Sequence, residues 1–192
     1  MIREAYRDGI FPMGDPEHDR ITWHQPKRRA VLPLDGFHVS RSLARTLSLG
    51  RFQVSFNQAF AQVIDACADR PRAGGTWITP RLRDAYVALH KLGQASSVEV
   101  WKDNALAGGL YGVHLGGAFF AESKFHRVSD MSKVALAQLV FHLRDRGFRL
   151  LEVQYLTPHL EQFGAIEITH RAYLQRLQEA LRAPCEFAAK PL

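Results

Sequence analysis

The sequence predicts an α+β fold, and three observations lead to that prediction. Residues 97–125 contain three successive segments with strand patterns, the first two joined by the hairpin-turn pair Asp103-Asn104. Residues 131–146 then give the most regular helical spacing of apolar residues in the chain. Strand and helix segments alternate from there to residue 181. Mixed order of this kind is typical of α+β domains.

The first quarter of the chain predicts little regular structure. Residues 2–9 fit a short helix that ends at a glycine. Residues 11–34 contain four prolines and are expected to be loop-like, and residues 40–47 fit a second short helix. We expect a small N-terminal lobe of residues 1–49 and a main domain of residues 50–192.

In the main domain, residues 52–55 predict a strand and residues 57–69 a helix, followed by a turn at 70–75. Thr79-Pro80 is an N-cap followed by proline at the first helical position, and Gly93 lies just past the end of that helix. Strands are expected at 97–101, 105–114 and 118–125, and after the central helix at 149–154 and 165–168. A helical turn at 159–163, a helix at 170–181 and a loose tail from Pro184 complete the prediction.

An antiparallel meander that leads into a long helix and a parallel strand is the plan of the N-acetyltransferase-like (GNAT-like) acyltransferases, a mixed sheet with flanking helices. Coenzyme A enzymes of that plan bind pyrophosphate with a glycine-rich turn before the central helix. Here residues 126–133 read HRVSDMSK and contain no glycine. If the chain is an acyltransferase, the acyl group is expected on another carrier, and no cofactor is predicted.

Composition limits the partners and the compartment. The formal net charge is +6, which favours a polyanionic partner such as nucleic acid, although the basic residues are spread out and a run such as 27–29 is typical of a solvated surface. No apolar run reaches the roughly 18 residues of a membrane span, and the first residues lack the apolar core of a secretory signal. Two distant cysteines fit a reducing cytoplasm. Neither a helical zinc motif nor a nucleophile elbow is present, and no metal is predicted.

Glu122 is the most informative polar residue. It stands near the end of an apolar strand that follows the glycine pairs at 108–109 and 116–117. A carboxylate in such a place is often a site residue, because burying it without a partner costs free energy. The alternative is a twisted hairpin whose glycines relieve crowding and whose glutamate points to water.

Short blocks spread along nearly the whole chain closely resemble the leucyl/phenylalanyl-tRNA–protein transferases. These blocks, in order, are AYRDGIFPM, FHVSRSL, TWIT, AYVALHKLG, SVEVW, GGLYGV, FFAESKF, MSK and EVQ. The resemblance implies transfer of Leu or Phe, with Met as a further candidate, from aminoacyl-tRNA to proteins with N-terminal Arg or Lys, which creates a degradation signal. It also implies a small N-terminal lobe on an acetyltransferase-like domain. The expected partners are therefore aminoacyl-tRNA and such acceptor proteins, with no membrane, and the expected state is a cytoplasmic monomer.

The resemblance assigns roles to individual residues. Glu122 and Gln154 would act at the reaction, with Glu152 orienting Gln154. The residues implied in substrate binding are Tyr6, Met13, Trp77, Tyr86, Leu110, Phe119, Ala121, Lys124 and Thr157. Arg41 and Arg45 would bind tRNA. Taken singly, each aromatic residue reads as core packing, and the two arginines read as a solvated helix face.

Three positions depart from the family pattern. Met13 stands where the family usually has Trp, Glu152 replaces Asp, and Lys124 replaces Met. These departures keep alternatives open. One is a tRNA-dependent aminoacyltransferase with a different amino acid or acceptor, and another is a descendant that binds aminoacyl-tRNA without catalysis. A coenzyme A acetyltransferase is disfavoured by the glycine-free junction.

Overall fold

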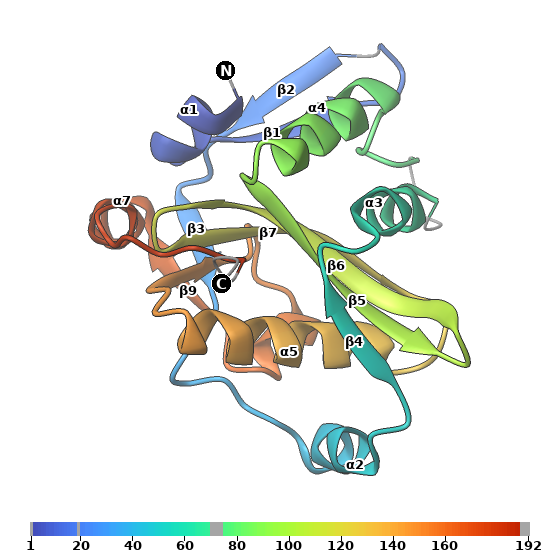
Figure 1. Ribbon diagram of the computed structural model, residues 1–192. Coiled ribbons are helices and arrows are strands. Elements are labelled where there is room, and N and C mark those ends of the chain that lie inside the picture. Colours follow the sequence, from blue (N-terminus) through green and yellow to red (C-terminus); the bar gives the residue numbers. More distant parts are fainter. Residues whose placement is uncertain (1, 19, 70–74, 189–192) are drawn as a thin grey trace.

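The computed structural model describes residues 2–18, 20–69 and 75–188, and a seven-stranded mixed sheet lies at its centre (Figure 1). The strand order is β4-β5-β6-β7-β8-β3-β9. Neighbouring strands run antiparallel except β7 and β8, which are parallel. The strands are β3 (Arg28–Val31), β4 (Gln53–Phe56), β5 (Ala95–Lys102), β6 (Ala105–Leu115), β7 (Ala118–His126), β8 (Leu150–Glu152) and β9 (Ile166–Thr169).

The predicted meander is confirmed in β5, β6 and β7. Asp103 and Asn104 join β5 to β6 with φ angles of 51° and 60°, a left-handed turn that Asp and Asn tolerate well. Gly112 of β6 shows why glycine is needed inside a strand. A Cβ there would lie 2.3 Å from the carbonyl oxygen of Phe120, so the close approach is that of another backbone.

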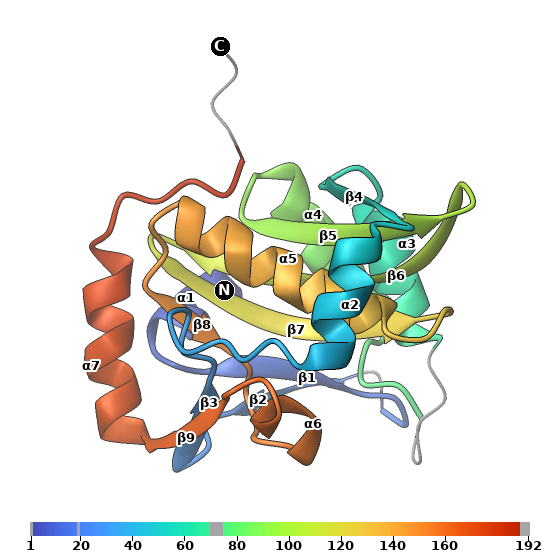
Figure 2. The ribbon, with the colours of Figure 1, turned by 90° about the horizontal axis from the view of Figure 1, so that it is seen from below.

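Helices cover both faces of the sheet (Figures 1 and 2). One face carries α1 (Ile2–Arg7), α3 (Phe60–Ala68), α4 (Pro80–Lys91) and α7 (His170–Leu181), and the other carries α2 (Arg41–Leu49) and α5 (Met131–Asp145). A separate apolar core cluster lies on each face. None of the helices in the described part of the chain is long and apolar enough to cross a membrane.

The expected loop at residues 11–34 is wrong, because three strands form there. β1 (Phe11–Asp15) and β2 (Arg20–His24) make a two-stranded antiparallel pair, and β3 inserts between β8 and β9 of the main sheet. The prolines do not prevent this, since Pro12 sits in a two-stranded pair and Pro26 lies between strands. β3 belongs to the part of the chain before residue 50, yet it is a strand of the main sheet. The division into a lobe of residues 1–49 and a domain of residues 50–192 stays a prediction.

Several predicted boundaries shift for local reasons. α3 begins at Phe60 because Asn57 takes a φ of 62° and its side chain accepts a hydrogen bond from the Ser97 N–H at 3.0 Å. The strand expected at 149–154 ends at Glu152, because Gln154 has a φ of 62°. The cap at Thr79 is confirmed, and α6 (Pro158–Glu161) begins one residue before the helical turn predicted at 159–163 and ends two residues short of its end. The turn expected at 70–75 lies almost wholly outside the described residues.

The tail was expected to be loose from Pro184, and this is wrong for residues 184–188. Phe187 is 2% exposed, and its ring contacts those of Phe119 and His114. The Nε2–H of His142 donates to the Phe187 carbonyl oxygen at 2.7 Å. An aromatic anchor therefore fixes this segment on the α5 side of the sheet.

We expect Phe187→Ala to lower the free energy of unfolding by about 3 kcal/mol, because the variant leaves a cavity among several rings. Chemical denaturation followed by tryptophan fluorescence would measure the change. Leu92→Ala is the control, since Leu92 is 69% exposed and its truncation should cost less than about 0.5 kcal/mol. Equal effects of the two variants would contradict a fixed tail.

Candidate active site

A β-bulge places Glu122 in the interior. Along β6 and β7, Gly112 pairs with Ala121 and Tyr111 pairs with Ser123, so Glu122 is the extra residue of β7 and has no partner across the ladder. A bulge redirects the side chain of the extra residue. Glu122 is 7% exposed. Its carboxyl points to the face of the sheet that carries α1 and α4, as its hydrogen bonds show.

Three side chains from three parts of the chain donate hydrogen bonds to this carboxyl. The Tyr6 hydroxyl, on α1, is 2.5 Å from Oε1 of Glu122. The Tyr86 hydroxyl, on α4, is 2.9 Å from Oε2, and Nε2 of Gln154 is 3.0 Å from the same oxygen. The two tyrosine oxygens are also 2.9 Å apart. Glu122 and Gln154, which were predicted to act together, are thus in contact in the structure, and both tyrosines bond the same carboxyl.

Burial sets the titration of this cluster. It raises the pKa of Glu122 to about 8, and the negative charge of Glu152 adds to the rise, while the bonds from Tyr6, Tyr86 and Gln154 oppose it. Burial also raises the pKa of both tyrosines well above the usual value, so they remain donors. A carboxyl that titrates near neutral pH is suited to accept and return a proton during a reaction.

Glu152 supports Gln154 through the backbone. Its Oε1 accepts the Gln154 N–H at 2.6 Å and also receives the Nε–H of Arg29 at 2.8 Å. Gln154 lies beyond the end of β8 and has a left-handed backbone, so its side chain does not continue the alternation of the strand. The additional methylene of Glu152 still leaves its carboxyl within hydrogen-bond reach of Gln154.

Strands β7 and β8 part beside this cluster and leave a small cavity. Their parallel pairing ends at Phe120 and Glu152. Beyond that point lies a cavity of about 100 Å³. It is lined by Leu110, Ala121, Glu122, Ser123, Lys124, Leu136, Val153, Gln154 and Leu160. Most of these side chains are apolar, so the cavity suits an apolar group whose polar end faces Glu122 and Gln154.

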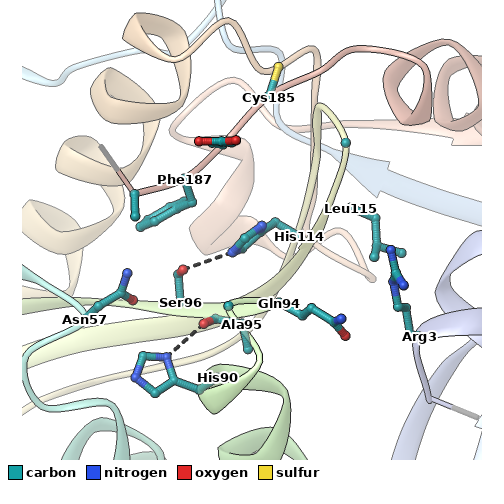
Figure 3. A pocket seen from close by; sticks show the side chains of 14 residues that line it. Arg3, Asn57, His90, Gln94, Ala95, Ser96, His114, Leu115, Cys185 and Phe187 are labelled. Atoms are coloured by element: carbon teal, nitrogen blue, oxygen red, sulfur yellow. Dashed lines mark hydrogen bonds between the residues drawn. The ribbon is translucent and has the colours of Figure 1, made fainter. Parts of the chain in front are cut away.

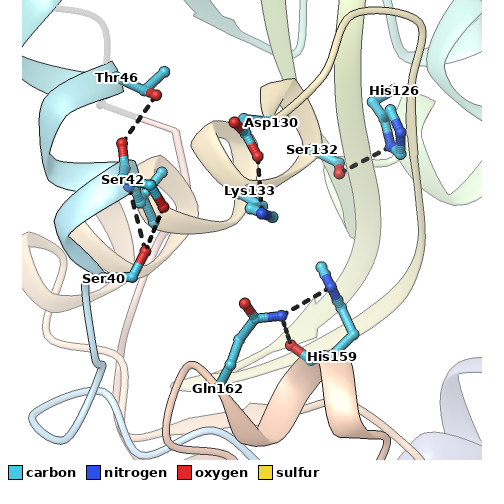
Figure 4. A network of polar contacts seen from close by, with 10 residues as sticks. Ser40, Ser42, Thr46, His126, Asp130, Ser132, Lys133, His159 and Gln162 are labelled. Atoms are coloured by element: carbon cyan, nitrogen blue, oxygen red, sulfur yellow. Dashed lines mark hydrogen bonds and ion pairs between the residues drawn. The ribbon is translucent and has the colours of Figure 1, made fainter.

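A larger cavity of about 630 Å³ adjoins the first, and the two share Glu122, Ser123, Lys124 and Leu160. The rest of its lining is more polar and consists of Trp77, His126, Ser132, Thr157 and His159. The Ser132 hydroxyl lies 3.3 Å from Nδ1 of His126, where β7 leads into α5. Figure 4 shows this pair, with His159 of α6 on the other side of the opening. An apolar pocket and a larger polar one therefore meet at one carboxyl.

The structure brings together most of the predicted residues. Those in contact with Glu122 or lining one of the two cavities are Tyr6, Trp77, Tyr86, Leu110, Ala121, Lys124, Gln154 and Thr157. Phe119 is different, since it is fully buried on the α5 side against Phe187 and lines neither cavity. Met13 is half-buried against the core cluster that includes Tyr6 and also lines neither. Arg41 and Arg45 lie exposed on α2.

The sequence did not reveal several residues of the site. Arg29 was read as part of a solvated basic run, but it is fully buried and paired with Glu152. The flanking Arg28, the first residue of β3, is exposed. Residues 29–31 are all buried, so the segment has no alternation of exposed and buried positions that could have marked Arg29 in the sequence. His126, Ser132 and His159 gave no signal, because they converge only after folding.

The described residues form no candidate metal centre, and some of them line a separate cavity away from Glu122. No group of three or more His, Cys, Asp or Glu side chains among them is placed to hold a metal ion. A separate cavity of about 470 Å³ lies at the opposite end of β6, between His114, Gln94, Arg3 and the segment around Cys185 (Figure 3). It shares no lining residue with the two cavities at Glu122.

Comparison with known proteins gives consistent matches. A family model described as leucyl/phenylalanyl-tRNA protein transferase matches residues 31–178, and one for the N-terminal domain of the same description matches residues 1–27. Curated proteins named leucyl/phenylalanyl-tRNA–protein transferase are similar: one from Ruegeria pomeroyi is 50% identical over 98% of this chain and 89% of its own length, and one from Novosphingobium aromaticivorans is 53% identical over 95% and 70%.

Among solved structures, L-PGS from Bacillus licheniformis aligns with a TM-score of 0.53 at 10% identity, over 93% of this chain and 75% of that one. At that identity the likeness is one of fold alone. The α+β, acetyltransferase-like mixed sheet expected from the sequence is confirmed, and so is the family to which the sequence motifs pointed.

The raised pKa of Glu122 predicts a pH dependence of stability. The folded chain keeps a proton that the unfolded chain releases between about pH 4.5 and 8, so the free energy of unfolding should fall as pH rises through that window. Glu122→Gln has no titrating group at this position and should not lose stability in this way. In denaturant titrations, the free energy of unfolding of the variant should therefore rise relative to that of the wild type between pH 5 and pH 8. Glu161→Gln, which removes an exposed carboxyl, controls for the lost charge. Parallel stability curves for Glu122→Gln and the wild type would contradict the raised pKa.

Proposed function

We propose that this chain, which belongs to the leucyl/phenylalanyl-tRNA protein transferase family, transfers Leu or Phe from aminoacyl-tRNA to the N-terminus of an acceptor protein. The observation that carries the proposal is the convergence of Tyr6, Tyr86 and Gln154 on a buried Glu122, at the junction of a small apolar cavity and a larger polar one. The acceptors are proteins that begin with Arg or Lys, and the product is a degradation signal.

The two cavities suit the two parts of the donor. The small cavity between β7 and β8 receives the apolar side chain of the amino acid, beside Leu110, Leu136 and Val153. The larger one receives the terminal adenosine, with Trp77 offering a ring on which a base can stack. The scissile ester then lies next to Glu122, which lines both cavities, and Gln154, which lines the small one.

The reaction needs positioning and proton transfer more than activation, because an aminoacyl ester is already reactive. The free α-amino group attacks the ester carbonyl, a C–N bond forms, and the bond from carbonyl carbon to ribose oxygen breaks. The Glu122 carboxylate takes the proton from the amine, and the ribose oxygen gains a proton as it leaves. Gln154 holds the amine with its side-chain oxygen while its amide nitrogen keeps Glu122 in place.

Charge supports the choice of partners. Glu122 is the one acidic side chain among the described residues that line the larger cavity, and in its ionised form it also attracts the cationic N-terminal end of an acceptor. The net charge of +6 and the exposed Arg41 and Arg45 on α2 favour tRNA phosphates. A single chain builds the cluster and both cavities, so we propose that it acts as a monomer, in the cytoplasm where charged tRNA is available.

A second candidate is favoured by one observation. Lys124 is the one cationic side chain among the described residues that line the small cavity. A cation there favours an aminoacyltransferase of the same reaction whose donor differs from Phe. Transfer from a panel of charged tRNAs would separate the two candidates.

We expect Glu122→Gln to reduce transfer by at least about 100-fold, because the amide cannot take the proton from the amine. The assay is incorporation of labelled Leu or Phe from charged tRNA into a peptide that begins with Arg. Circular dichroism should show an unchanged fold, and Glu161→Gln on α6 should retain wild-type transfer. Unchanged transfer in Glu122→Gln would remove Glu122 from the mechanism.

Lys124 gives a prediction about the donor. A cavity of about 100 Å³ is smaller than the roughly 150 Å³ that holds a benzene ring, so Leu should be preferred over Phe. Lys124→Ala enlarges the cavity, and we expect the Phe-to-Leu ratio of kcat/KM to rise at least about 10-fold. Lys124→Met keeps the length of the side chain and removes its charge. A rise in Lys124→Met as large as that in Lys124→Ala would attribute the effect to charge, and no rise in either would contradict the assignment of the cavity.

A further inference from the structure

Arg29 lies at the centre of a buried junction that the reaction scheme does not use. Its side chain, on β3, is fully buried between two aromatic rings, with the guanidinium carbon 4.7 Å from the ring centre of Phe11 and 4.6 Å from that of Tyr173. Its Nε–H donates to Oε1 of Glu152 at 2.8 Å, and its Nη1–H donates to the Gly9 carbonyl oxygen at 2.9 Å. One rigid group thus bonds two distant segments at once.

The first of these segments carries Tyr6. The Gly9 N–H bonds the Tyr6 carbonyl oxygen at 3.1 Å, so Gly9 closes the end of α1. Gly9 has a φ of 73°, and a Cβ there would lie 2.9 Å from Leu174, so its position leaves no room for another residue. By holding the Gly9 carbonyl, Arg29 fixes the helix that places the Tyr6 hydroxyl on Glu122.

The second segment carries Gln154. The Glu152 oxygen that receives Arg29 also receives the Gln154 N–H, at 2.6 Å. This bond stabilises the left-handed backbone of Gln154, which turns its amide toward Glu122. Without Arg29, the carboxylate of Glu152 would be buried without a counter-charge and would have to move or take up a proton.

We propose that Arg29 is a positioning residue for the transfer reaction, which holds Tyr6 and Gln154 together on Glu122 from a single buried site. The inference rests on the proposed function. The role of Arg29 is to fix the geometry of its neighbours rather than to stabilise the fold. A buried ion pair adds little net stability compared with apolar side chains of the same volume, but its hydrogen bonds hold the bonded groups in one orientation. The neighbouring carboxylate also offsets the cost of burial, which keeps the guanidinium charged and its donors in place.

Arg29→Lys tests the inference, because lysine keeps the charge but cannot bond both acceptors as one planar group. We expect kcat to fall at least about 10-fold, since a misplacement of about 1 Å can cost about 100-fold. KM for aminoacyl-tRNA should change less than about 3-fold. The groups facing Glu122 are Tyr6, Tyr86, Gln154 and, through charge, Glu152. Weaker bonds from Tyr6 and Gln154 should move the acidic limb of the profile of kcat against pH to higher pH, which a loss of folded protein would not do.

Two further variants complete the design. Arg28→Lys makes the same chemical change at an exposed neighbour on β3, which pairs with Glu167 on the surface, and should keep wild-type kcat and pH profile. In a Gln154→Ala background, adding Arg29→Lys should lower kcat less than about 3-fold, because the residue acts through Gln154 and the remaining effect is through Tyr6. Independent, multiplying effects would overturn the inference.

Arg29→Lys can also fail to fold, and Phe11→Leu then takes its place. This variant keeps the ion pair but removes the aromatic ring that packs on one face of the guanidinium. It should move the acidic limb of the profile of kcat against pH to higher pH, as Arg29→Lys does, but by a smaller amount. A wild-type profile in the folded variant overturns the role of Arg29 while the proposed function stands. Failure of the wild-type chain to transfer Leu or Phe overturns the proposed function itself.

Discussion

The site depends on the burial of one carboxyl group beside a break in a strand ladder. Glu122 leaves the β6–β7 pairing at the bulge and enters the core, where a charge without partners would cost far more than the fold could tolerate. Tyr6, Tyr86 and Gln154 supply the partners. Because each comes from a different element, the packing of α1, α4 and the end of β8 must be correct before the carboxyl can be accommodated. The same constraint leaves Glu122 close to the balance between its charged and neutral forms.

The sheet supplies the space in which such a carboxyl can act. β7 and β8 are the one parallel pair in the described sheet, and their pairing stops after three residues. The strands then part, and side chains of β7 and of the residues that follow β8 line a cavity between them. Other proteins with the same architecture bear different chemistry, since the fold provides only the opening. What gives this opening its chemistry is the set of side chains around it, above all the adjoining Glu122 and Gln154.

Much of the fold could be predicted from local patterns, and the errors have physical causes. The meander, the cap at Thr79 and the central helix follow from turn residues and periodicity, which act over a few positions. The strands between residues 11 and 31 were missed because prolines at strand edges look like loop prolines. The anchoring of Phe187 was missed because its partners, such as His142 and Phe119, lie far away in the sequence. Phe119 was expected at the pocket, but the alternation along β7 before the bulge turns it to the opposite face.

The sequence by itself determined the family, the order of the strands along the chain from residue 53 onward and the presence of a carboxylate near the end of an apolar strand. These follow from residue types and short spacings, which do not change on folding. Only the tertiary structure decided where that carboxylate points, which tyrosines bond it, and that Arg29 is buried rather than solvated. A bulge, a left-handed residue at Gln154 and a strand inserted between β8 and β9 each depend on contacts between residues that are distant in the chain. Their free energy is set by packing, which local sequence does not contain.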